Sequence, residues 1–563
     1  MAGMRRWLGA RCDSTEDERS AMTFALSQTL PLVKLDPPRL LRTAVSLRDQ
    51  RRHSCEVNQM GQICERKKKD TPGIDCNEAR RPLHRASCRK RHVSTTAMIA
   101  EALLAVLALS ALTTASDPSQ WEVTSVPGLD QPLNFKHYSG FVDASEGRRL
   151  HYWFMESQRS PSEDPVLLWL NGGPCCSSLI GAIAELGPFR VGYQGINMTT
   201  NPFSWNKVAN IIFLESPAGV GFSYDPTGNY ASDDTKTTRD NYLAVLDFFD
   251  KYPQFKQNDF YIAGESYAGV YVPLLAQLFL QNPRGINLKG YAVGNGALDM
   301  ELLGNSIMFF GYYHGLFGHR LWKELTANCC NGSISQETCD FGWSTKDPAC
   351  VQPVRRANYI VLNSGLNVYN LYDPCSYNQS SWSLALRYPE TTMHYATRWL
   401  MSRFFKRPTT SFNMVSPKCI DQDRLQLYFN RRDVIKALHV EESPLQWYPC
   451  NLAINYTEQY TTMREVVRDL AESGQLKALV YNGDVDMACN FLGGDWFVNS
   501  LGYEPTSEYR MWHVGQVIAG FVQNFEHDVT FVTVKGSGHM VPLDKAQESL
   551  HMISNFLSGA PFS

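Results

Sequence analysis

Ser266 lies at a position that suits a catalytic nucleophile. It belongs to GESYAG at 264–269, which follows the G-x-S-x-G pattern with its second glycine one residue later. An apolar run at 260–263 precedes it, and a stretch of helical periodicity follows from residue 270. Small residues at a strand-to-helix turn let the backbone turn tightly and expose the serine oxygen. A buried serine at a glycine-rich strand end is the alternative, and the placement favours the nucleophile.

A serine nucleophile needs a general base and an orienting acid, which this kind of turn takes in the chain order Ser, Asp, His. His539 lies in GSGHMVP at 536–542, a loop just beyond an apolar run that ends at Val534. Asp484 and Asp486 follow another apolar run, and from the residues alone either can be the acid while the other is a turn residue. Three other histidines lie in a strand-like segment, a turn and a helix: His513, His527 and His551.

A third motif, NGGP at 171–174, follows the apolar run 166–170. Small residues there let backbone N–H groups approach a substrate oxygen, as an oxyanion hole requires. A simple β-turn is the alternative for this motif taken alone. All three motifs follow apolar runs, and the carboxyl ends of parallel strands gather at one edge of a sheet. We therefore expect one active site at that edge.

The elements that must position these motifs alternate along the chain from about residue 116. Short, continuous apolar runs predict strands buried on both faces, and the stretches between them have helical spacing. This alternation predicts an α/β fold with a mostly parallel central sheet covered by helices. Strands are expected at 166–170, 211–214, 260–263, 290–293, 478–481 and 529–534, and helices at 241–252, 270–280 and 543–557.

The region 298–420 interrupts the alternation. It holds more than half of the cysteines that follow residue 116, together with many aromatic residues and proline-punctuated polar stretches. We interpret it as a disulfide-rich cap inserted into the core. The core then has two parts, residues 116–297 and 421–563.

The 563 residues carry a net charge of −3, but residues 1–97 are basic and the remainder is acidic. An acidic core disfavours nucleic acid as a partner, because phosphate binding needs a basic face. Residues 1–97 lack sustained periodicity and are interpreted as an unstructured extension, with a gene-model artefact as the alternative. ALLAVLALSAL at 102–112, followed by small residues, predicts a signal peptide over 98–115, with a signal anchor as the second interpretation.

The expected location is the lysosome or the extracellular space, reached through the secretory pathway. No apolar run reaches the roughly 18 residues of a membrane span. Ten of the 15 cysteines follow residue 116 without a C-x-x-C pair or a matching histidine cluster, so neither a metal nor another cofactor is expected. Such cysteines in a secreted chain predict disulfides. Four N-x-S/T sequons agree with that route: Asn197, Asn331, Asn378 and Asn455.

Six motifs together resemble those of the serine carboxypeptidases, most closely the cathepsin A type. They are NGGP at 171–174, ESPAGVGFSY at 215–224, GESYAG at 264–269, GNG at 294–296, GDVDMACN at 483–490 and GHMVP at 538–542. The resemblance extends from about residue 126 to the C-terminus. It implies the α/β-hydrolase fold and the release of the last amino acid of a peptide through an acyl-enzyme, without a metal or cofactor.

The resemblance also implies roles for single residues. Ser266 is the expected nucleophile, His539 the general base and acid, and Asp486, rather than Asp484, the orienting acid. The oxyanion hole is expected from the backbone N–H groups of two residues, Gly173 and Tyr267. The substrate's C-terminal carboxylate is expected to be bound by a further set: Asn171, Gly172, Glu185 and Glu265.

A glutamate pair can bind a carboxylate only if at least one member is protonated, since only a neutral carboxyl group donates a hydrogen bond. Burial and the neighbouring like charge favour this neutral form. Peptidase activity is therefore expected to peak below neutral pH. Two surface glutamates that serve solubility are the alternative.

By the same resemblance four disulfides are expected: Cys176–Cys450, Cys329–Cys350, Cys330–Cys339 and Cys375–Cys419. The last of these closes a loop with the basic stretch 403–408, where cleavage into two linked chains is expected. Homodimers and lysosomal glycosidase partners are expected on the same ground, in addition to the peptide substrates.

Two residues depart from the family pattern. Cys175 replaces a glycine and Ile180 replaces an aspartate. A glycine at 175 can serve a backbone with positive φ, where a cysteine is strained by about 1 kcal/mol or more. Two other functions stay open. One is an acyltransferase of the same fold, in which an alcohol intercepts the acyl-enzyme. The other is a weakly active protective scaffold, which the two departures favour modestly.

Overall fold

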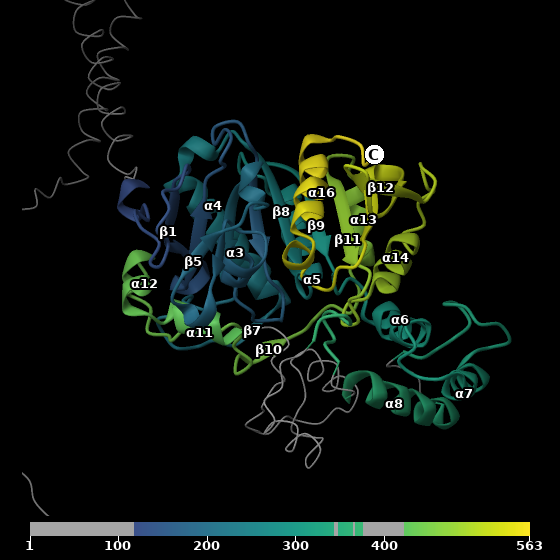
Figure 1. Ribbon diagram of the computed structural model, residues 1–563. Coiled ribbons are helices and arrows are strands. Elements are labelled where there is room, and N and C mark those ends of the chain that lie inside the picture. The colour runs from purple at the N-terminus through teal and green to yellow at the C-terminus, as the bar shows by residue number, and fades with distance from the viewer. Residues whose placement is uncertain (1–117, 343–346, 364–365, 375–421) are drawn as a thin grey trace, which may run out of the picture. The chain divides into compact units, whose positions relative to one another are not determined.

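The computed structural model describes residues 118–563 except 343–346, 364–365 and 375–421 (Figure 1). Several of the features expected from the sequence lie outside the described residues. They are the extension 1–97, the signal peptide 98–115, the disulfide Cys375–Cys419, the sequon at Asn378 and the basic stretch 403–408.

A ten-stranded sheet organises the described chain, in the order β1-β2-β6-β3-β8-β9-β11-β14-β13-β12. The strands from β6 to β14 in this order are parallel, and an antiparallel hairpin extends the sheet at each edge. Their bounds are β1 His137–Asp143, β2 Arg149–Met155, β3 Val166–Leu170, β6 Asn210–Leu214, β8 Asp259–Glu265, β9 Asn287–Gly294, β11 Lys477–Gly483, β12 Arg510–Val514, β13 Val517–Phe525 and β14 Val529–Val534.

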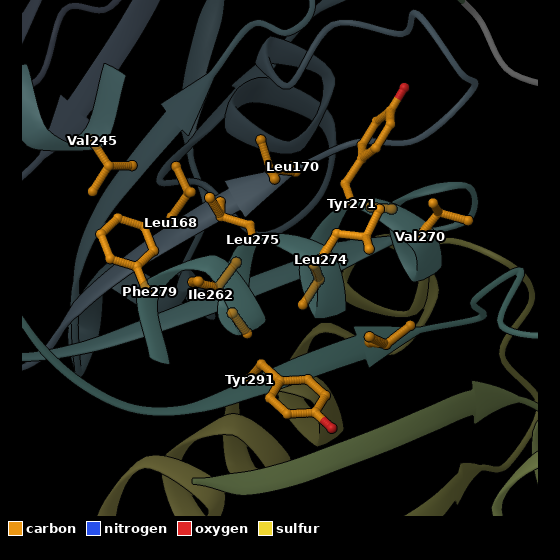
Figure 2. Packing of buried hydrophobic residues seen from close by; sticks show 14 of the residues in the cluster. Leu168, Leu170, Val245, Ile262, Val270, Tyr271, Leu274, Leu275, Phe279 and Tyr291 are labelled. Atoms are coloured by element: carbon orange, nitrogen blue, oxygen red, sulfur yellow. The ribbon is translucent and has the colours of Figure 1, made fainter. Parts of the chain in front are cut away.

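Helices cover both faces of this sheet, and two apolar clusters fill the layers between. One face carries α4 Asp234–Lys251, α5 Ala268–Gln281, α13 Arg464–Glu472 and α14 Phe491–Asn499. The other carries α3 Leu179–Ala184, α11 Gln422–Phe429, α12 Arg432–Ala437, α15 Val541–Asp544 and α16 Ala546–Ser558. Figure 2 shows the first layer, where Leu168 of β3 and Ile262 of β8 pack against Val245 of α4 and Leu275 of α5.

Burial on both faces explains why these strands read as continuous apolar runs. Every residue of β3 and β6 is buried, so both faces of each strand are apolar apart from Asn210 at the start of β6. All six strands expected from apolar runs lie within observed strands, and the mostly parallel sheet covered by helices is confirmed. The expected helix 543–557 is wrong in one respect, because α15 ends at Asp544 and α16 begins at Ala546.

After β9 the described chain leaves the sheet and first forms the helices α6 Met300–Tyr313, α7 His319–Cys329 and α8 Pro348–Asn363. They share a small apolar core that includes Phe309, Trp322 and Phe341. Two-stranded pairs are formed by β4 Phe189–Val191 with β5 Met198–Thr200, and by β7 Ser232–Asp233 with β10 Tyr456–Thr457. Short 3-10 turns complete the chain at Pro118–Trp121, Ser145–Gly147, Tyr193–Gly195, Trp205–Lys207, Pro253–Phe255 and Glu526–Asp528.

Candidate active site

Ser266 lies at the turn between β8 and α5, where the chain reverses sharply. Its φ is +63°, a left-handed conformation that serine rarely adopts. The turn is held from both sides, because the Ser266 N–H donates to the Gly294 carbonyl (3.1 Å) and the Ser266 carbonyl accepts from the Ala297 N–H (2.9 Å). A strained serine that neighbouring backbone holds in place is typical of a nucleophile turn.

His539 and Asp486 form a buried pair beyond the ends of β14 and β11. The distance from His539 Nδ1 to Asp486 Oδ2 is 2.7 Å. The Asp486 carboxylate also accepts from Asn295 Nδ2 (2.9 Å) and from the N–H groups of Ala488 (2.9 Å) and Cys489 (3.1 Å). These donors fix the carboxylate. Because Nδ1 is engaged by Asp486, Nε2 is the ring atom that can exchange a proton with a substrate or nucleophile.

Asp484 has a different partner. Its Oδ1 accepts from the Gly536 N–H at 2.6 Å, which joins the loops that follow β11 and β14. Of the two aspartates that the sequence leaves open, the structure brings Asp486, and not Asp484, into contact with His539.

The segment Val368–Leu371, which we call the clamp, holds both loops of this pair. The Val368 carbonyl accepts from the N–H groups of Met487 (3.0 Å) and Ala488 (3.1 Å), and the Tyr369 carbonyl accepts from the His539 N–H (2.7 Å). The Tyr369 ring also lies against the imidazole, with 5.0 Å between ring centroids. The clamp follows α8, in a region whose sequence has no motif that marks it, and sequence reasoning missed it.

The loop at 171–174 lies directly against the nucleophile turn. A Cβ atom on Gly172 would be 2.3 Å from the Tyr267 nitrogen, so only glycine permits this approach. Gly173 has φ +117°, and the Gly172 carbonyl accepts from the Cys176 N–H at 3.0 Å. The two segments expected to supply oxyanion donors are thus brought together beside Ser266.

Asn171, Glu185 and Glu265 form a buried polar cluster next to the nucleophile. Asn171 Nδ2 donates to Glu185 Oε1 (3.0 Å) and to Glu265 Oε1 (2.9 Å). Asn171 Oδ1 accepts from Trp169 Nε1 (2.8 Å) and from the Gly181 N–H (3.2 Å), which determines which end of the amide faces the glutamates. The two glutamates are not surface residues, because their exposed fractions are 0% and 5%.

Burial raises the pKa of both glutamates. For Glu265 the rise is large, since the nearby charge and hydrogen bond of Glu185 add to desolvation. The pKa of Glu185 is also raised by burial, against the opposing effect of hydrogen bonds from its neighbours. Glu185 Oε2 is buried and accepts no hydrogen bond from another described residue. The two carboxyl groups are hydrogen-bonded to each other, and a proton on one of them removes their repulsion.

The described chain contains three disulfides, Cys176–Cys450, Cys329–Cys350 and Cys330–Cys339, which are three of the four pairs that the resemblance implies. The sequon residues Asn197, Asn331 and Asn455 are exposed. Among the described residues, no cluster of three or more His, Cys, Asp or Glu side chains is arranged to hold a metal. The same residues include no helix long and apolar enough to cross a bilayer.

Cys175 has φ +74°, the positive value that a glycine in this position would serve. Its side chain is buried and packs with Val220 and Ile454, and its carbonyl accepts from the Asn451 N–H at 2.9 Å. Ile180 is 5% exposed and belongs to the apolar layer on the α3 side of the sheet. The side chains of both departures from the family pattern are thus packed in apolar surroundings.

Replacing Cys175 with glycine is expected to change the free energy of unfolding by less than about 1 kcal/mol. The relief of positive φ (about 1 kcal/mol) is offset by lost packing and by the larger entropy of the unfolded glycine chain. Cys175→Ala keeps the strain and loses the packing, so it should unfold more easily than the glycine variant. Denaturant unfolding and the rate of Ser266 labelling by a fluorophosphonate measure both effects. A gain in labelling rate above about tenfold in Cys175→Gly would show that the cysteine disables the site.

The chain is similar to several known proteins. The family model for serine carboxypeptidase matches residues 127–559. The chain is 42% identical to the lysosomal protective protein of Mus musculus and 41% identical to serine carboxypeptidase ctsa-4.1 of Caenorhabditis elegans, each over 79% of this chain and 95% of the relative. Among solved structures, the prohormone-processing carboxypeptidase Kex1 of Saccharomyces cerevisiae superposes with a TM-score of 0.61 at 23% identity, over 79% of this chain and 96% of that one.

Proposed function

The chain belongs to the serine carboxypeptidase family, and from this premise we propose how its residues carry out the reaction. It has the α/β-hydrolase fold and is a hydrolase that acts as an exopeptidase. The observation that carries the residue assignments is the buried cluster of Asn171, Glu185 and Glu265 immediately beside Ser266. A protonated carboxyl and an amide at this place suit the recognition of a peptide's free carboxylate next to the bond that is cleaved.

In acylation, Ser266 Oγ attacks the carbonyl carbon of the last peptide bond while His539 Nε2 accepts the hydroxyl proton. The negative oxygen of the tetrahedral intermediate accepts hydrogen bonds from the Gly173 and Tyr267 N–H groups. The intermediate collapses when His539 returns the proton to the leaving amine, and the terminal amino acid departs. Asp486 keeps the imidazole oriented and stabilises its charged form throughout.

In deacylation, water takes the place of the departed amino acid. His539 removes a proton from this water, whose oxygen attacks the acyl carbon through a second tetrahedral intermediate in the same oxyanion hole. Collapse of that intermediate breaks the bond to Ser266 Oγ, which regains its proton from His539. The shortened peptide leaves with a new free carboxylate, so the product of one cycle has the end group that the next one requires.

Release of single C-terminal residues is expected from a blocked dipeptide and from longer peptides with a free carboxylate, but much more slowly from their C-terminal amides. Mass spectrometry of the products, with each substrate at equal concentration, measures this stepwise loss of C-terminal residues. Products from internal cleavage would contradict the assigned carboxylate site. Adding an alcohol tests the acyltransferase alternative, which predicts an ester as the main product.

The working environment is proposed from several features together. Three disulfides and three exposed sequons suit the secretory pathway, and the mouse relative is named a lysosomal protein. We therefore place the enzyme in the lysosome or outside the cell, with activity at acidic pH. The homodimer and the glycosidase partners stay predictions from the resemblance. Sedimentation of the purified enzyme, alone and mixed with a lysosomal glycosidase, tests both.

A further inference from the structure

Tyr267 follows the nucleophile in the chain. Its backbone N–H is a proposed oxyanion donor, whereas its side chain is held in the protein interior. The ring is 2% exposed and makes edge-to-face contacts with Tyr271 and Tyr456, at centroid distances of 5.3 and 5.9 Å. Its hydroxyl donates to Asp234 Oδ1 at 2.8 Å. Burial and the Asp234 charge raise the pKa of Tyr267 far above its usual value, so the hydroxyl keeps its proton and stays a donor.

Asp234, the first residue of α4, is held by four donors. Oδ1 accepts from the hydroxyls of Tyr267 and Tyr456 (2.9 Å), and Oδ2 accepts from the N–H groups of Gln459 (2.6 Å) and Tyr460 (3.2 Å). The residue is fully buried, with an exposed fraction of 0%. A buried carboxylate with all its hydrogen bonds formed is a rigid anchor, since rotation of the group would break several of them.

Three of the four donors to Asp234, those of Tyr456, Gln459 and Tyr460, belong to the stretch 449–460, which we call the brace. The brace also holds the loop that bears the other oxyanion donor. The Ser177 N–H donates to the Pro449 carbonyl (2.8 Å), the Asn451 N–H donates to the Cys175 carbonyl (2.9 Å), and Cys450 is disulfide-bonded to Cys176. One short stretch of chain thus contacts the neighbours of Gly173 directly and reaches Tyr267 through Asp234.

We propose that Asp234 is a positioning residue of the oxyanion hole, which aligns the Tyr267 N–H with the Gly173 N–H by fixing Tyr267 to the brace. This inference rests on the proposed assignment of those two N–H groups as oxyanion donors. The Asp234 carboxylate touches no reacting atom. It acts through the Tyr267 side chain, and its effect is therefore felt when the tetrahedral intermediate forms and not when the substrate binds.

The test compares two deletions of a single hydroxyl, Tyr267→Phe and Tyr456→Phe. Each removes one donor to the same oxygen of Asp234, so a merely structural role predicts equal effects on the two variants. Positioning predicts that Tyr267→Phe lowers kcat by about tenfold with KM within about twofold, because a loosened oxyanion donor loses part of the 10²–10³-fold effect of a deleted one. For Tyr456→Phe, kcat should fall by less than about threefold.

Inhibitors provide a second readout. A peptide aldehyde forms a tetrahedral adduct, so its Ki should rise by about tenfold in Tyr267→Phe, while the Ki of a product peptide stays unchanged. Asp234→Asn should reproduce both shifts. If this variant does not fold, the tyrosine pair still decides the question. Equal kcat values for the two tyrosine variants, or parallel changes in both Ki values, would overturn the proposal. Ser266→Ala, inactive in either case, tests the function separately.

Discussion

Replacing Ser266 or His539 with alanine is expected to lower kcat by about 10⁴-fold or more, because the nucleophile and its base act as one unit. Asp486→Asn should have an effect of about 10⁴-fold. An asparagine has only one side-chain oxygen. It therefore cannot accept all the hydrogen bonds that the two Asp486 oxygens accept from His539 and the neighbouring N–H groups. The imidazole then loses both its orientation and the charge that stabilises its protonated form.

Asp484→Asn is the matched control, since it makes the same chemical change two residues away. Asp484 accepts from the Gly536 N–H, and an asparagine Oδ1 can keep that bond. Its kcat/KM is expected to fall by less than about tenfold. Thermal unfolding of both variants separates lost chemistry from lost fold. An inactive Asp484→Asn beside an active Asp486→Asn would reverse the assignment that the 2.7 Å contact supports.

The second large effect is expected in the pH dependence of peptide binding. The pKa values of Glu185 and Glu265 are raised above their usual range, so the pair keeps a proton at pH values where a free glutamate is ionised. Below the raised pKa, the pair donates a hydrogen bond to the substrate carboxylate. Above it, two negative charges face that carboxylate. KM should therefore increase as pH rises through the raised pKa, and kcat/KM for a free peptide should fall about tenfold per pH unit.

Glu265→Gln should reduce the fall of kcat/KM at high pH, the alkaline limb of the profile, because an uncharged amide donates at every pH. Glu185→Gln is the companion variant and should act in the same direction, since either change removes one charge of the pair. A C-terminal amide substrate, measured from about pH 4 to about pH 8, is the substrate control and should lack the limb. The proposal fails if free peptide, amide and both variants share one profile.

The same groups link pH to folding stability. In the unfolded chain a glutamate ionises near its ordinary pKa, whereas the folded pair binds its proton more tightly. Between the two pKa values the folded state therefore holds more protons than the unfolded state, and the free energy of unfolding falls as pH rises. The stabilisation is complete below the ordinary glutamate pKa and is lost as pH rises through the folded one.

Much of the core was predictable because buried parallel strands have continuous apolar sequences, as in β3 and β6. The nucleophile turn and the loop at 171–174 could be found for a related reason, since each directly follows such a strand. The edge hairpins β1–β2 and β12–β13 were not predicted. The strands of the first are almost wholly buried, but the buried polar residues His137, Ser139 and His151 interrupt their apolar sequences. The strands of the second are only partly buried, which weakens their apolar signal. Edge strands are placed by pairing with their neighbours, which a local pattern does not record.

The contacts between loops were less accessible to sequence reasoning. From the residues alone, Asp484 and Asp486 were equivalent candidates, and only the position of His539 distinguishes them. The positive φ expected at position 175 is observed. It could be predicted because it depends on the backbone of a single residue. Asp234 and Tyr369, in contrast, act through partners 33 and 170 residues away along the chain (267 − 234 and 539 − 369), and such separations leave no local pattern.

The clamp has a consequence for protein engineering. Its backbone carbonyls hold the loops of both Asp486 and His539, yet it lies on the stretch of chain that leaves the sheet after β9 and that carries α6, α7 and α8. A chimaera joined on the α8 side of Val368 would take α6, α7 and α8 from a donor and leave the recipient's clamp with the loops that it holds. A chimaera joined between Leu371 and β11 would instead bring in the donor's clamp together with α6, α7 and α8. It would separate that clamp from the recipient's loops of Asp486 and His539. Recombination in this family is thus safest where clamp, acid loop and base loop come from one parent.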